Sequence, residues 1–233
     1  MRSIIPRRSE ALKAVLAPCL PAETSAWLKD SCRLFQDGMD LVECYVRFAE
    51  VSGRLGTARL RCLLRSEADL RASGLSPETA EWSLDECGRV VLLAQAAAHL
   101  SEDKLADLVE SCYFQGETRE RQGIVRSLWY LPRTDRLLQI GLDAGRTHVQ
   151  PLFDALACEN AFPAEAFPDT SFNHLVLKAL FTEVRLARLV GLPTRMTSEL
   201  RRMVSDFVDE RRAAGRPIPA DVALILPAKG GTR

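Results

Sequence analysis

Residues 153–215 read FDALACENAFPAEAFPDTSFNHLVLKALFTEVRLARLVGLPTRMTSELRRMVSDFVDERRAAG, and this stretch decides the fold. Its apolar residues recur at helical spacing and are interrupted by turns that contain Pro or Gly. A helix expected over 170–190 is apolar almost all the way round, which is typical of a buried helix. Asn173 and Glu183 fall among its apolar positions. Buried polar groups need partners, so we expect a site in this part of the chain.

The rest of the chain continues the same pattern. No segment shows the sustained period-two alternation of a strand. Further helices are expected over 8–16, 23–35, 40–51, 57–73, 77–98, 102–114, 117–130, 135–144 and 147–158. We therefore predict an all-α fold of paired antiparallel helices, either an irregular helical-hairpin array like a HEAT superhelix or a bundle. Because no internal linker is visible, residues 1–227 are predicted to form one domain, with a disordered tail over 228–233.

Composition limits the classes of protein to which this chain can belong. Its 31 Lys and Arg residues balance its 31 Asp and Glu residues, and acids are interleaved with arginines. A nucleic-acid-binding surface needs an excess of positive charge, so we expect no nucleic-acid partner. The seven cysteines include no Cys-x-x-Cys pair, and their number is odd. That pattern is typical of free thiols in a reducing cytoplasm.

Signals for targeting, membranes and cofactors are missing from the sequence. The basic start is followed by a short apolar stretch over 11–17 that Lys13 interrupts, so no signal peptide is expected. No stretch approaches the ~18 uncharged apolar residues of a membrane span. The three histidines lack the spacing of metal ligands, and no dinucleotide or phosphate-loop motif occurs. We therefore expect a cytoplasmic protein with no membrane span, metal or cofactor.

Two polar residues of the helix expected over 170–190 are candidates for a site. At 100° per residue, Asn173 falls beside apolar residues, whereas Lys178 shares the one polar face. Asn173 either holds a neighbouring loop through its backbone or contacts a ligand. Lys178 is either a solvated or snorkelling lysine or part of the site.

The last long helix contributes a second group of candidates. Arg211 continues the apolar stripe of this helix, Glu210 lies at its edge, and Arg216 follows the Gly that ends the helix. An arginine on a core stripe needs a carboxylate or carbonyl groups, and Glu159 and Glu183 are the candidate partners. Arg211 therefore either locks the C-terminal helices through a salt bridge or recognises an anion.

The helix expected over 77–98 contributes the third group. Asp85 and Arg89 are four residues apart and can pair along the helix. Glu86 and Trp82 are also four apart and are expected to share a face. A carboxylate beside an indole at a cavity rim is either an acid with a tuned pKa or a paired structural acid.

Several motifs, in this order along the chain, resemble one family. They are WSLDECGRVVLL at 82–93, RERQ at 119–122, the segment 153–167 with ENAFP at 159–163, NHLVLKALF at 173–181, GL-x-x-R at 191–195 and ERRAAGR at 210–216. On these motifs the chain resembles the EboA family over about residues 82–216. The family usually has Tyr in an Asn-Pro-Tyr-Pro-like turn, where this chain has Phe162 and, before it, Ala161. No role of a tyrosine hydroxyl is therefore carried over.

The resemblance implies membership of a bacterial gene cluster. Companion proteins in such clusters resemble a prenyltransferase, a metal-dependent hydrolase, a sugar isomerase and a cyclase related to dehydroquinate synthase. The clusters are linked to making specialised metabolites or moving them between cytosol and periplasm. A resemblance at the family level supplies no mechanism.

Two hypotheses about function follow. In the first, the chain is a non-catalytic accessory protein that binds a protein of the same cluster or a small metabolite in a polar pocket of the C-terminal helices. In the second, it is an enzyme acting on a prenylated or cyclitol-like intermediate. Glu86 or Glu159 would then be the acid or base. Lys178 and Arg211 would hold an anionic group. The candidate residues are Glu86, Arg89, Glu159, Asn160, Asn173, Lys178, Glu210, Arg211 and Arg216.

Overall fold

The structure is a computed structural model that describes residues 4–35, 40–64, 70, 75 and 77–227. Within these residues the chain forms α-helices and short 3-10 turns, and the one isolated β-bridge joins Arg59 to Ser83. The α-helices are α1 (Ile4–Leu16), α2 (Ala22–Leu34), α3 (Leu41–Leu55), α5 (Leu84–His99), α6 (Glu102–Gln115), α7 (Thr118–Ser127), α8 (Asp135–Arg146), α9 (Gln150–Ala157), α10 (Phe162–Ala166), α11 (Asp169–Phe181) and α12 (Ser198–Ala213). The predicted all-α fold is confirmed, whereas the expected tail over 228–233 lies outside the described residues.

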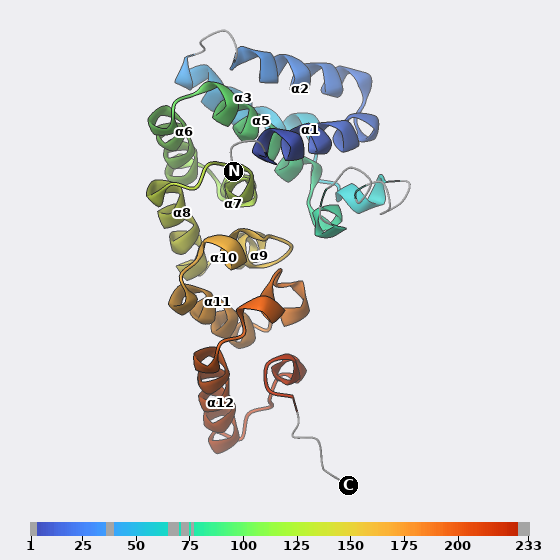
Figure 1. Ribbon diagram of the computed structural model, residues 1–233. Helices are drawn as coiled ribbons and strands as arrows, with labels where there is room; N and C mark the ends of the chain where they lie inside the picture. The colour runs from blue at the N-terminus through green and yellow to red at the C-terminus, as the bar shows by residue number, and fades with distance from the viewer. Residues whose placement is uncertain (1–3, 36–39, 65–69, 71–74, 76, 228–233) are drawn as a thin grey trace.

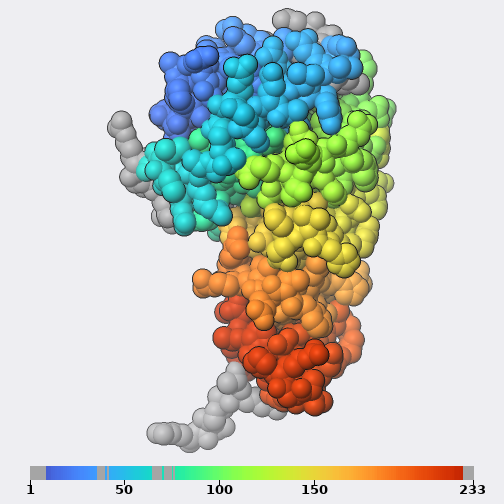
Figure 2. Space-filling view, turned by 180° about the vertical axis from the view of Figure 1, so that it is seen from behind, coloured from blue at the N-terminus to red at the C-terminus, as the bar shows by residue number. Residues whose placement is uncertain are grey.

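The helices are stacked along one long axis in the order of the sequence (Figure 1). α1, α2, α3 and α5 form the N-terminal end, α6, α7 and α8 follow, and α9 to α11 lead to α12 at the other end. Figure 2 shows the same succession from behind, with the colours passing from blue to red along the molecule. Helices close in sequence are therefore close in space, as expected for paired antiparallel helices. Not one of the described helices has the length and apolar content needed to cross a lipid bilayer.

The N-terminal half is organised around α5. Ser83 begins this helix with a capping box, in which the backbone N–H of Ser83 donates to Glu86 Oε2 at 2.8 Å. Every residue from Leu84 to Ala96 is buried, because α1, α2, α3, α6 and α7 all pack against this helix. The helix predicted over 77–98 therefore begins too early. Residues 77–81 form the separate 3-10 turn η3 (Pro77–Glu81), and the cap at Ser83 starts the α-helix.

The prediction of one helix over 170–190 is wrong at its C-terminal end. α11 ends at Phe181, and Glu183 adopts a positive φ of 59°. The N–H of Val184 donates to the carbonyl of Ala179 at 2.8 Å, and the N–H of Glu183 donates to Leu180 at 3.4 Å. These two bonds form the Schellman motif that commonly ends a helix. Glu183 is consequently exposed, contrary to its predicted place among buried apolar residues.

The described residues 57–64 do not form the start of the helix predicted over 57–73. Residues 57–64 contain the 3-10 turn η2 (Leu60–Cys62), and most of 65–73 lies outside the described residues. The other predicted helices are present with shifted ends. The last of them, α12, ends at Ala213, and Gly215 follows with a positive φ of 64°, as its sequence position predicts.

Candidate functional site

A buried ion-pair cluster lies at the N-terminus of α5. Arg89 Nη1 is 3.0 Å from Asp85 Oδ2, and both side chains are almost completely buried. Arg119 of α7 donates to both oxygens of the same carboxylate, at 3.0 and 2.7 Å. The hydroxyl of Ser52 in α3 donates to Asp85 at 2.8 Å and accepts from Arg89 at 3.0 Å. The predicted pairing of Asp85 with Arg89 is confirmed, and this one carboxylate joins three helices.

Opposing effects set the pKa of Asp85. Burial raises the pKa of its carboxyl, but hydrogen bonds from Arg119, Ser83 and Ser52, together with the charge of Arg119, outweigh burial. The pKa of Asp85 therefore lies below its ordinary value, and the group is ionised at neutral pH. Its negative charge orients the guanidinium groups of Arg89 and Arg119.

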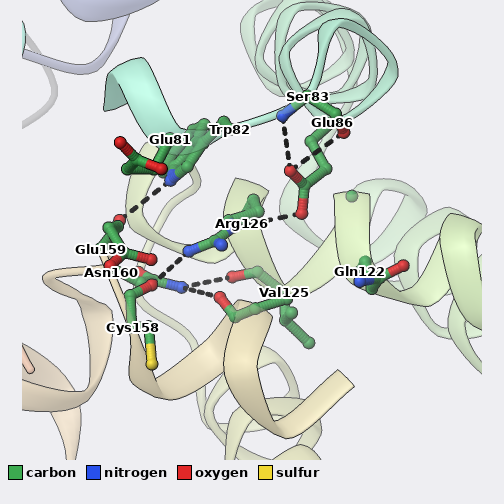
Figure 3. Close-up of polar contacts among 12 residues, drawn as sticks. Glu81, Trp82, Ser83, Glu86, Gln122, Val125, Arg126, Cys158, Glu159 and Asn160 are labelled. Carbon is green, nitrogen blue, oxygen red and sulfur yellow. Dashed lines mark hydrogen bonds and ion pairs between the residues drawn. The ribbon is translucent and has the colours of Figure 1, made fainter. Parts of the chain in front are cut away.

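Arg126 of α7 is the centre of a second cluster (Figure 3). Its side chain is 6% exposed, and its Nε lies 3.4 Å from Glu86 Oε1. Its Nη1 donates to the carbonyl of Cys158, which follows α9. The guanidinium carbon lies 5.1 Å from the centroid of the Trp82 ring, a cation–π contact. Arg126 thus connects the start of α5 with the end of α9.

The turn after α9 is fixed from two sides at Glu159. This residue has a left-handed φ of 49°, and its carbonyl accepts a hydrogen bond from Trp82 Nε1 at 3.0 Å. Its carboxylate accepts two hydrogen bonds from Arg188, at 2.8 and 2.9 Å. Such bidentate pairs fix the planes of both groups. Glu159 therefore holds the guanidinium of Arg188 in one orientation.

Asn160 anchors the same turn to α7. Its Nδ2 donates to the carbonyls of Val125 and Ala155, at 3.1 and 3.2 Å. Its Oδ1 accepts from the backbone N–H of Phe162 at 3.0 Å. Both N–H groups and the amide oxygen are engaged, so Asn160 holds the turn in place beside Arg126.

A polar cavity of about 330 Å³ is lined by members of both clusters. Its charged lining residues are Arg59, Arg119, Arg126, Arg188, Glu86 and Asp154. Four guanidinium groups against two carboxylates give the lining a formal excess of two positive charges, although the whole chain is neutral. The size is that of a small-molecule site. Within the described ranges, no group of three His, Cys, Asp or Glu side chains is placed to hold a metal ion.

Asn173 and Lys178 lie away from this cavity. Lys178 Nζ donates to the carbonyls of Gly145, at 2.9 Å, and Thr147, and it lies 4.6 Å from the ring centroid of Phe153. Burial lowers the pKa of Lys178. This lysine ties α11 to the turn between α8 and α9 and lines a second cavity there. Asn173 is buried, and its Oδ1 has no hydrogen-bond partner among the residues described.

Arg211 does not form the ion pairs expected of it. Glu159 is bound by Arg188, and Glu183 forms no ion pair with Arg211 in the described part of the chain. Arg211 Nε instead donates to the carbonyl of Pro217 at 2.6 Å. It lines a third, open groove at the C-terminal end of the molecule.

The predicted pocket residues therefore separate into different places. Arg89 belongs to the cluster around Asp85, and Glu86, Glu159 and Asn160 lie in or beside the cluster around Arg126. The remaining predicted site residues, Asn173, Lys178, Glu210, Arg211 and Arg216, lie on α11 or at the end of α12. Of these, Glu210 and Arg216 are exposed.

None of the four described cavity arginines, Arg59, Arg119, Arg126 and Arg188, was among the predicted site residues. Arg119, Gln122 and Arg126 recur at spacings of three and four, so they share one face of α7. Arg126 also stands among the apolar residues of that helix, and this signal could have identified it as a buried, paired cation. Arg188 carries no comparable signal, because its position depends on the 3-10 turn η5 (Leu186–Arg188) and on a partner far away in sequence.

Comparison with known proteins identifies the family. A family model described as "Metabolite traffic protein EboA" matches residues 8–226, nearly the whole chain. The comparisons found no match with a curated protein or a solved structure. The family match extends beyond the motifs at 82–216 and includes the N-terminal helices that enclose α5. The chain therefore belongs to the EboA family of metabolite traffic proteins.

Proposed function

We propose that this chain is a binding protein in metabolite traffic and that it holds a small metabolite in the cavity between α5, α7 and α9. Arg126 is the observation that carries the proposal. This side chain is 6% exposed, yet it lines an open cavity together with Arg119 and Arg188. Buried ion pairs contribute little net stability. Clusters of this kind at the wall of a cavity are frequent at functional sites.

The cavity arginines are held in place before any ligand arrives. Asp85 binds Arg119, Glu159 binds Arg188, and the Cys158 carbonyl binds Arg126. Side chains that are already ordered lose little conformational entropy on binding. This pre-organisation supports a binding role for the cavity.

The alternative of an acid–base enzyme has less support. Glu86 accepts the backbone N–H of Ser83 through one oxygen and faces Arg126 with the other. Both oxygens of Glu159 accept from Arg188. A general acid or base must reach a substrate proton, whereas these carboxylates bind and orient neighbouring groups.

Native mass spectrometry of the untagged protein from its own host tests the proposal. We expect a non-covalent small-molecule adduct on the wild-type protein. An Arg119→Gln variant should lose the adduct, because Arg119 lines the cavity. The matched control is Arg121→Gln, since Arg121 lies on the same helix but pairs with Asp143 outside the cavity. Wild-type protein that carries a partner protein and no adduct would contradict the proposal.

A further inference from the structure

We infer that the ligand of this cavity is a small hydroxylated molecule that carries a phosphate or carboxylate group. The inference rests on the proposed function and specifies the chemical class of its ligand. Two features of the cavity carry it: N–H groups on arginines that are already fixed, and acceptor oxygens on one wall.

Arg119 and Arg188 keep N–H groups for a ligand. A guanidinium has five N–H donors. Arg119 uses Nε and Nη2 on Asp85 and Ser83, and Arg188 uses Nε and Nη2 on Glu159. Nη1 of either arginine donates to no residue in the part of the chain that the structure describes. Each side chain is thus fixed by one edge and can donate from the other.

Arg126 repeats this arrangement at a more buried position. Its Nε faces Glu86 and its Nη1 donates to the carbonyl of Cys158, whereas its Nη2 donates to no described residue. A buried guanidinium next to a cavity gains more from a charged acceptor than an exposed one, because water screens it less. Arg126 is therefore the strongest donor that a ligand would meet.

These donors fit an oxyanion better than a neutral group. Phosphate and carboxylate oxygens accept several directed bonds from guanidinium groups, and such charge-assisted bonds are about twice as strong as neutral ones. The lining has two more positive than negative groups, but Asp85, Glu159 and Glu81 bind its arginines from outside. With these three carboxylates counted, the arginines no longer outnumber the acids, so recognition rests on directed donors and not on net charge.

The wall formed by α9 and its neighbours supplies acceptors for hydroxyl groups. Gln150 Nε2 donates to Asp154 Oδ1 at 2.7 Å, and Gln122 Nε2 donates to the carbonyl of Pro151 at 3.1 Å. These bonds leave the amide oxygens and Asp154 Oδ2 as acceptors. Among the described lining residues, the apolar side chains are those of Pro151 and Ala155. Such a wall suits a hydroxylated molecule and not a hydrocarbon chain.

Calorimetric titration with glucose 6-phosphate, glucose and inorganic phosphate tests the inference on the full-length protein. The informative pair of variants is Arg59→Gln and Arg61→Gln. Both arginines pair with Glu81, and their side chains are 52% and 55% exposed, but of the two only Arg59 belongs to the described lining. Neither variant leaves a buried charge unpaired, so both should fold.

We expect glucose 6-phosphate to bind the wild type with a millimolar or lower Kd and glucose not to bind. Arg59→Gln should weaken binding about tenfold, the loss expected for a charge-assisted hydrogen bond, and Arg61→Gln should leave it unchanged. Inorganic phosphate that binds as tightly as glucose 6-phosphate would overturn the hydroxylated part of the inference. Equal binding by both variants would place the anion outside the cavity and would also overturn it.

The same titration separates failure of this inference from failure of the proposed function. An adduct from the host that contains no phosphate or carboxylate, combined with no binding of glucose 6-phosphate, overturns the ligand class and leaves the binding role intact. No adduct and no binding of any probe would overturn both.

Discussion

Asp85 is the centre of the ion-pair cluster at the N-terminus of α5. Its carboxylate accepts hydrogen bonds from Ser52, Ser83, Arg89 and Arg119. These donors come from α3, α5, the cap before α5, and α7. Removing this one charge therefore affects several helices at once.

Asp85→Asn should lower the free energy of unfolding by about 3–5 kcal/mol at neutral pH, because it leaves the buried Arg89 without its counter-charge. Urea denaturation measures this loss. The folded-state pKa of Asp85 is lowered, so its contribution is present above the unfolded-state pKa, about 4, and is lost as the pH falls through the folded-state pKa. The difference in the free energy of unfolding between the wild type and Asp85→Asn should therefore become smaller at acidic pH.

Asp107→Asn is the matched control for this prediction. Asp107 also pairs with an arginine, Arg136, but its side chain is 57% exposed. Exposed ion pairs contribute little, so the free energy of unfolding should stay almost unchanged. If the free energies of unfolding of Asp85→Asn and the wild type differ by the same amount at every pH, the ionised carboxylate of Asp85 is not the source of the stability.

A residue of the site could be predicted from the sequence only where its partner lies a few positions away in the same helix. The spacing of Asp85 and Arg89 within one helix is sufficient to predict their pair. The pair of Glu159 and Arg188 joins two turns 29 positions apart, and sequence spacing suggested Arg211 as the partner instead. Long-range packing, which periodicity does not report, decides between such partners.

Helix α7 packs tightly against Arg89 of α5 at Gly123. A Cβ added there would lie 2.4 Å from Arg89 Cδ and 2.8 Å from Arg89 Cβ. Arg89 is buried and bonded to Asp85, so it has little freedom to move. The glycine therefore permits the packing that brings Arg119 and Arg126 to the cavity.

Gly123→Ala should lower the free energy of unfolding by about 1–3 kcal/mol, the usual cost of overpacking. Gly53→Ala is the control, because an added Cβ at this exposed position in the last turn of α3 meets no atom within 4 Å. That change should raise the free energy of unfolding by about 0.5–1 kcal/mol, since alanine favours the helix. Chemical denaturation of both variants checks the prediction. Equal changes in the free energy of unfolding would contradict the close packing of α7 against Arg89.

Helical periodicity alone did not predict where α11 ends. Val184 and Leu186 continue an apolar pattern, but the chain closes a Schellman motif with Glu183 in the left-handed conformation. Glycine usually occupies this position, and its absence removed the stop signal from the sequence. A periodic pattern does not indicate the end of a helix when the residue in the left-handed conformation is not glycine.

Glu183→Gly should raise the free energy of unfolding by up to about 1 kcal/mol, because glycine adopts a positive φ without steric cost. Glu183→Ala keeps the strained conformation and should give no gain. Thermal melts of the two variants measure the difference. A Tm for Glu183→Gly below that of Glu183→Ala would contradict the turn described at the end of α11.

The whole molecule is an elongated stack, so its stability is expected to vary along the axis. α5 is surrounded by α1, α2, α3, α6 and α7, whereas α12 packs mainly on α11. In stacked helical proteins each layer depends on its neighbours, and end layers open first. The paired helices could be predicted because the apolar spacing that indicates each helix lies within one short segment of the sequence. The cavity could not, because three helices separated in sequence form it.

Hydrogen–deuterium exchange measured by mass spectrometry should show this gradient. Amides of α12 are expected to exchange faster than amides of α5 and α7, because α12 has neighbours on fewer sides. Equally slow exchange in all three helices would indicate that they unfold as one cooperative unit. It would contradict the expectation that stability falls from α5 towards α12.

The most direct test of the central claim is an NMR titration that observes the arginine Nε–H signals while glucose 6-phosphate is added. The cavity account predicts shifts for Arg119, Arg126 and Arg188, which line the site. It predicts no shift for Arg202, which pairs with Glu199 on the surface of α12. Shifts confined to arginines outside the cavity, or no shifts at millimolar ligand, would contradict the claim that this cavity binds an anionic metabolite.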